Sequence, residues 1–92
     1  MQSAGWELGE SFDYPQYKFK GVAVKIRTGP SISYSETGKT LKTNDQVTVY
    51  EIYVPTNTTE NWFKISAPGS SPKWVAGDKY SEFANSWEKL NT

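Results

Sequence analysis

The chain of 92 residues contains no cysteine and no histidine. The absence of cysteine excludes disulfides and thiolate metal sites, and without histidine the usual ligands of zinc are missing as well. The commonest nucleophile and the commonest acid or base near neutral pH are absent for the same reason. No Gly-x-Ser-x-Gly sequence is present either, so we expect the chain not to be an enzyme.

An excess of charge is also lacking, because 10 basic and 10 acidic residues cancel. This balance disfavours a general binder of polyanions such as nucleic acid. Basic residues are nevertheless concentrated between residues 18 and 42, where Glu36 is the only carboxylate. We interpret this segment as a solvated strand face, with binding of nucleic acid or teichoic acid as the alternative. No apolar run approaches the ~20 residues of a membrane span and no charged, then apolar, leader opens the chain, so we expect no membrane partner.

Aromatic residues are abundant, at 15%, and can supply much of the core of one small domain. Short segments of β-forming residues recur along the chain, separated by Gly, Pro and Asn. This pattern predicts an all-β fold, a small barrel of short antiparallel strands. We place the barrel at residues 17–80, an N-terminal extension or linker at 1–16 and a C-terminal extension at 81–92.

Several local features are predicted within this frame. Val22, Val24 and Ile26 share one face of a strand, and the change of parity at Gly21 indicates a bulge or sharp bend. Residues 31–38 form a loop, residues 43–45 a turn after the core residue Leu41, and residues 46–54 the strongest strand, with two valines pointing inward at 47 and 49.

The two ends of the chain carry further aromatic residues. Ser81 is predicted to cap one or two turns of helix that carry Phe83, Trp87 and Leu90. Trp6 and Phe12 are expected to dock on the domain, because exposed aromatic side chains lower solubility.

An ordered set of short motifs runs through residues 22–80. Residues 24–31 read Val-Lys-Ile-Arg-Thr-Gly-Pro-Ser, residues 45–49 Asp-Gln-Val-Thr-Val, residues 62–65 Trp-Phe-Lys-Ile and residues 74–75 Trp-Val. With Gly38, Leu41 and Tyr80, this order resembles the bacterial SH3-like (SH3b) family. Asn44 and Lys73 replace glycines of the family pattern, and the loops at 55–61 and 67–72 are long for it.

The resemblance implies an SH3-like barrel and a role in recognition of the bacterial cell wall. Such domains are often attached to peptidoglycan hydrolases, including phage endolysins and autolysins. It therefore implies a non-catalytic module, extracellular or in the cell wall, that binds the stem peptide or crossbridge of peptidoglycan and has a catalytic hydrolase domain as a partner.

Three tyrosines are candidates for contact with such a ligand, because each offers an apolar ring with a hydroxyl. Tyr34 lies in a polar loop, Tyr50 lies on the opposite pleat from the inward valines of its strand, and Tyr53 adjoins a long loop.

Tryptophans and carboxylates are further candidates, each with a structural alternative. Trp62 and Trp74 either stack on sugar rings or belong to the core. Glu36 and Asp45 either receive amines of the ligand or are only solvated. Arg27 either binds an anionic group through its fork of donors or ties the Gly-Pro corner to a neighbouring strand.

The competing function is that of a protein-interaction or oligomerisation domain of a bacterial surface protein. In that case the terminal extensions form the interface, through their large apolar side chains Trp6, Phe12, Phe83, Trp87 and Leu90.

Overall fold

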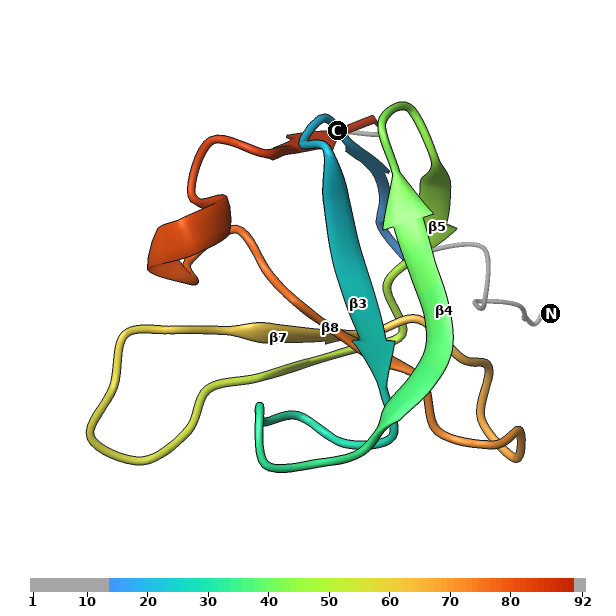
Figure 1. The fold of residues 1–92 in the computed structure, drawn as a ribbon, viewed down its shortest axis with the longest axis vertical. Helices are drawn as coiled ribbons and strands as arrows, with labels where there is room; N and C mark the ends of the chain where they lie inside the picture. The colour runs from blue at the N-terminus through green and yellow to red at the C-terminus, as the bar shows by residue number, and fades with distance from the viewer. Residues whose placement is uncertain (1–13, 91–92) are drawn as a thin grey trace, which may run out of the picture.

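The computed structural model describes residues 14–90, and their element labels follow Figure 1. These residues form eight short strands and one 3₁₀ turn, so the predicted all-β fold is confirmed. The elements are β2 (Gln16–Phe19), β3 (Ala23–Arg27), β4 (Glu36–Lys42), β5 (Gln46–Thr48), β6 (Glu51–Tyr53), β7 (Trp62–Lys64), β8 (Trp74–Ala76), η1 (Ser81–Phe83) and β9 (Trp87–Lys89).

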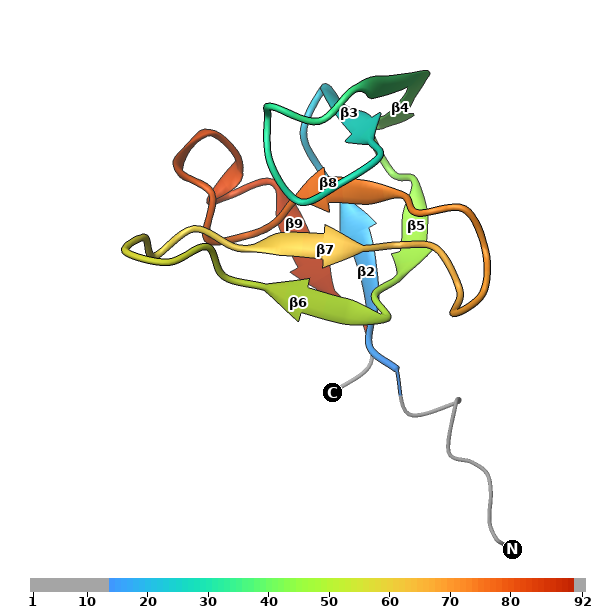
Figure 2. The ribbon, with the colours of Figure 1, turned by 90° about the horizontal axis from the view of Figure 1, so that it is seen from below.

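The strands build two antiparallel sheets that enclose one core (Figures 1 and 2). One sheet has the order β5-β2-β9 and the other the order β4-β3-β8-β7-β6. Two short sheets that exchange strands through tight corners make the small barrel that the spacing of turn residues predicts.

The bend predicted at Gly21 is the corner between β2 and β3, which lie in different sheets. A Cβ at position 21 would lie 2.6 Å from the ring of Phe19, so the corner requires glycine. The prediction that Val22 shares a strand face with Val24 and Ile26 is wrong. Val22 is 88% exposed, because the corner turns it outward before β3 begins at Ala23.

The strand predicted over 46–54 is divided between the two sheets. The amide of Val49 donates to the carbonyl of Pro15, next to β2, while that of Tyr50 donates to Lys64 of β7. The chain therefore crosses between the sheets within one residue step. Val49 is buried as predicted, whereas Val47 is only partly buried against the core.

β4 starts at Glu36, so the loop predicted over 31–38 is wrong for its last three residues. Leu41 is buried, and the predicted turn follows at once. Asn44 adopts a φ of 75°, a left-handed conformation that asparagine tolerates better than most residues. The side chain of Asp45 accepts a hydrogen bond from the amide of Lys42 at 2.8 Å and fixes the turn.

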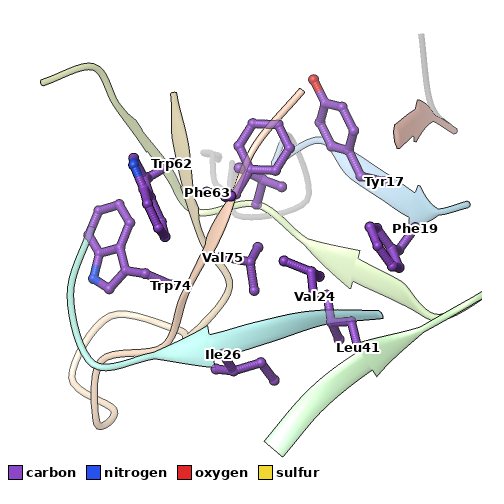
Figure 3. Close-up of a cluster of buried hydrophobic side chains, with 11 residues drawn as sticks. Tyr17, Phe19, Val24, Ile26, Leu41, Trp62, Phe63, Trp74 and Val75 are labelled. Atoms are coloured by element: carbon purple, nitrogen blue, oxygen red, sulfur yellow. The ribbon is translucent and has the colours of Figure 1, made fainter. Parts of the chain in front are cut away.

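The core is a single cluster of apolar side chains from both sheets (Figure 3). Phe19, Phe63, Val49 and Val75 are its largest fully buried members. The ring of Phe63 lies 4.8 Å from that of Tyr17 and 5.2 Å from that of Trp87, centroid to centroid, so one phenylalanine joins the two sheets.

The helix predicted after Ser81 is wrong beyond its first turn. Residues Ser81–Phe83 form a 3₁₀ turn, and Trp87 instead lies in β9, opposite Phe19 of β2. The strand wins because it uses the open edge of β2 and lets the Trp87 indole donate to the carbonyl of Ala76 at 3.1 Å. Segment 81–90 thus contributes a strand to the barrel, while Trp6 and Phe12 lie outside the described residues.

Candidate ligand-binding groove

A row of side chains crosses the outer face of the five-stranded sheet. Tyr53, Trp62 and Ala76 are direct neighbours on β6, β7 and β8. Directly opposite residues of antiparallel strands point to the same face, so this register places an aromatic surface there.

A hollow of about 450 Å³ lies over this row, within the range of about 300 to 1,000 Å³ usual for small-ligand sites. Its walls come from the loop between β3 and β4, from the loop after β6 and from the residue before η1. The lining residues are Pro30, Ser31, Ile32, Tyr34, Tyr53, Pro55, Glu60, Trp62 and Tyr80.

A second hollow of about 290 Å³ adjoins the first, because both are lined by Ile32, Trp62 and Tyr80. Its other walls are the outer face of β3, with Lys25 and Arg27, and the 3₁₀ turn. We call the two hollows together the groove.

Arg27 holds the loop that forms one wall of the groove. Its Nη1 donates to the carbonyls of Ile32 at 3.2 Å and Tyr34 at 3.0 Å, and its Nη2 lies 3.5 Å from a carboxylate oxygen of Glu36. The fork of donors on one planar group suits several acceptors at once. Arg27 was considered either as a binder of an anionic ligand group or as a structural tie for the Gly-Pro corner. These contacts are those of a structural tie.

The turn at Gly29 is set by Tyr34 from the same loop. A side chain at position 29 would collide with the ring of Tyr34, which therefore lies directly against the glycine. The ring remains 48% exposed and lines the larger hollow.

Two of the three candidate tyrosines thus meet in the groove, Tyr34 and Tyr53, and Tyr80 joins them. Tyr53 is 42% exposed and packs edge-on against Trp74, while Tyr80 packs edge-on against Trp62. Among the described residues, none donates to or accepts from the hydroxyls of these three tyrosines. Those hydroxyls are available to a ligand.

The third candidate, Tyr50, lies away from the groove. Its ring packs edge-on against Tyr14 at 4.9 Å, and it lines neither hollow. Both tyrosines follow the crossing at Val49, but they are three residues apart, so along an extended strand they point to opposite faces.

Trp62 and Trp74 are core residues in the structure, with 3% and 7% of their surface exposed. Figure 3 shows the two indoles at one end of the buried cluster. Stacking of a sugar on either ring is contradicted by this burial, since stacking needs an open ring face. Trp62 still forms the floor shared by both hollows.

The two candidate carboxylates are engaged in local structure. Glu36 lies 3.2 Å from Lys25 Nζ and close to Arg27, and Asp45 fixes its turn. Neither lines the groove. The carboxylates that do are Glu60, at the larger hollow, and Glu82, at the smaller one. Sequence reasoning missed both, because nothing distinguishes a groove-lining glutamate from a solvated one before the loops are placed.

The groove offers binding chemistry. It combines aromatic rings, the hydroxyls of three tyrosines and one serine, two carboxylates and two basic groups. Within residues 14–90, no group of three or more His, Cys, Asp or Glu side chains is placed to hold a metal ion. The same residues contain no helix with the length and apolar character needed to cross a membrane.

Burial raises the pKa of the Tyr17 phenol above its usual value of 10.0, and the nearby carboxylate of Asp78 adds to the effect. Tyr17 belongs to the core and not to the groove, so this shift concerns stability.

Comparison of the chain with protein-family models, with curated proteins and with solved structures gave no significant match.

Proposed function

We propose that the chain is a non-catalytic module of the SH3b type that binds bacterial peptidoglycan through its stem peptide or crossbridge. The observation that carries the proposal is the groove, where Tyr34 and Tyr53 present exposed rings and Tyr80 a partly buried one above Trp62. Within residues 14–90 the hydroxyls of these tyrosines have no hydrogen-bond partner. The order of motifs in residues 22–80 supports the same reading independently.

The chemistry of the groove suits a short extended peptide. Tyrosine rings provide apolar contact at low entropic cost, and their hydroxyls pair with peptide groups. Glu60 gives the larger hollow a carboxylate that can receive an amine of a stem peptide or crossbridge. In this proposal Glu60 takes the role that was one of the two alternatives for Glu36 and Asp45.

A wall-targeting role requires only modest affinity per site. Both hollows are partly open to solvent, and the groove holds no histidine or cysteine that could act as base or nucleophile. We infer that the module positions an attached or associated hydrolase on the wall, which places it outside the cell.

Co-sedimentation with purified bacterial walls tests this function. The double variant Tyr34→Ala/Tyr53→Ala removes two rings of the groove, and Tyr50→Ala is the matched control because Tyr50 lies elsewhere. We expect the double variant to lose about tenfold or more in wall affinity, equivalent to roughly 1.4 kcal/mol, and the control to bind like the unmodified chain.

Two results would contradict the proposal. If the unmodified chain stays in the supernatant with walls of every crossbridge type tried, wall binding is wrong. If the double variant remains folded by circular dichroism and binds undiminished, the groove is not the site.

The alternative, an interface made by the chain ends, is less well supported. Phe83 and Trp87 pack against the core, where both contact Phe19. Side chains committed to the core in this way contribute little to an external surface.

A further inference from the structure

Strand β6 lies at one edge of the five-stranded sheet. It pairs with β7 on one side, and within residues 14–90 no strand pairs with the other. Figure 2 shows β6 at the lower margin of this sheet. All three of its residues and the following Val54 are exposed.

A row of core side chains is cut off at this edge. Val75, Phe63 and Ile52 are neighbours on β8, β7 and β6 and share the inner face. The first two have no exposed surface, whereas Ile52 is 48% exposed. The apolar row therefore continues to the sheet edge, where its last side chain is half exposed.

The opposite edge of the same sheet is protected. β4 carries Glu36, Lys39 and Lys42, and its Gly38 has a φ of 89°, which interrupts regular strand geometry. Charged residues and irregular geometry are the usual means of preventing edge pairing. β6 has Glu51 as its only charge, no lysine, and no proline before Pro55.

We propose that β6 pairs antiparallel with β6 of a second copy of this chain, with the two-fold axis at Ile52. Directly opposite residues of antiparallel strands point to the same face of the sheet, so the axis must pair odd-numbered residues with odd-numbered ones and even-numbered residues with even-numbered ones. Centred on Ile52, the pairing places Ile52 opposite its own copy, Glu51 opposite Tyr53, and Tyr50 opposite Val54.

Charge selects this register over the one centred on Glu51. An axis at Glu51 would set two carboxylates directly opposite each other, which destabilises a strand pair. At Ile52 no like charges are opposed, and the inner row runs unbroken through both copies. A second copy therefore complements this edge with no other protein required.

The pairing has a consequence for the groove, and this consequence alone rests on the proposed function. A two-fold axis perpendicular to the sheet keeps the outer faces of both copies on one side. Each β6 contributes its Tyr53 to a groove, so the two grooves would lie side by side. A repeating wall polymer could then occupy both, which raises the overall affinity.

Single-cysteine cross-linking tests the pairing directly, since the chain has no cysteine of its own. Opposed residues have Cβ atoms about 4.5 to 5.5 Å apart, close to the spacing that a disulfide needs. Under mild oxidation, Ile52→Cys is expected to give a covalent dimer at least about tenfold faster than Val22→Cys. Val22 is the matched control because it is 88% exposed and away from the edge.

Sedimentation equilibrium of the unmodified chain provides the second measurement. The apparent mass should rise with concentration from 10.4 kDa toward twice that value. Ile52→Lys should raise the dimer dissociation constant about tenfold or more, and Val22→Lys should leave it unchanged. A monomer at all concentrations up to about 1 mM, or equal rates of cross-linking at the two positions, would overturn the pairing. Neither measurement involves wall material, so failure of the pairing and failure of wall binding are seen separately.

Discussion

Replacement of Arg27 by methionine is the sharpest test of how the groove is held open. Methionine keeps much of the length and apolar stem of arginine but removes its donors. The change deletes the two hydrogen bonds to the carbonyls of Ile32 and Tyr34 and the contact with Glu36. The backbone of β3 and its pairing with β8 stay in place.

The expected loss of stability follows from these contacts. Hydrogen bonds from a charged donor contribute about 1.5 to 3 kcal/mol each, and less where water can replace the donor. Ile32 and Tyr34 are exposed, so we assign roughly 1 kcal/mol to each bond. The ion pair with Glu36, at 3.5 Å on the surface, adds only about 0 to 1 kcal/mol. The free energy of unfolding should fall by about 2 kcal/mol, which lowers Tm by roughly 10 °C in a domain of this size.

Urea denaturation followed by tryptophan fluorescence measures the loss of stability. Wall co-sedimentation measures the loss of wall affinity that we expect when the groove is no longer held in shape. Lys25→Met is the matched control, because Lys25 also contacts Glu36 but donates to neither loop carbonyl. We expect the control to cost less than about 1 kcal/mol. Lys25 itself lines the smaller hollow, so it is a control for stability and not for wall affinity. If Arg27→Met destabilises no more than Lys25→Met, or leaves wall binding intact, Arg27 does not organise the groove.

Three further predictions concern the core. Folding raises the pKa of Tyr17, so the folded chain keeps the phenol protonated at pH values where the unfolded chain loses the proton, and stability should fall as pH rises above about 10. Tyr17→Phe should reduce this alkaline loss of stability, measured as urea midpoints at two pH values. An identical loss in the variant would refute the prediction. Phe63→Ala should cost about 3 to 5 kcal/mol by urea titration, since the side chain is fully buried between the sheets, and a cost below about 1 kcal/mol would contradict its place there. Gly77→Ala should cost about 1 to 3 kcal/mol in the same assay, because a methyl group there collides with the side chain of Asn61. The amide nitrogen of Asn61 donates to Asp78 at 2.9 Å, so this side chain is held in place. An unchanged urea midpoint would show that Asn61 moves aside freely.

Where sequence and structure agree, a local pattern carried the information. The alternation of Val24 and Ile26 predicted one shared face of β3, and both are buried. The turn around Asn44 was visible because asparagine next to aspartate favours such a conformation. These features depend on residues close together in the chain.

The errors have a common physical cause, which is competition from distant partners. Residues 46–54 read as one strand, yet Val49 and Tyr50 bond to different sheets, because closing the barrel requires the chain to cross there. Trp87 had helical spacing from Phe83, but the free edge of β2 and the contact with Phe63 drew it into a strand. Local propensity is a weak force beside backbone hydrogen bonds and aromatic burial.

The candidate site divides in the same way. The sequence by itself determined that the chain is an all-β domain rich in tyrosine and tryptophan, without cysteine or histidine for catalysis, because composition and alternation are local properties. Only the tertiary structure decided that Tyr34 and Tyr53 meet Tyr80 and Glu60 in one groove, while Tyr50, Glu36 and Asp45 lie outside it and Trp62 and Trp74 are buried. The reason is that a groove is made by loops from distant parts of the chain, and their positions follow from how the sheets close and not from any one segment.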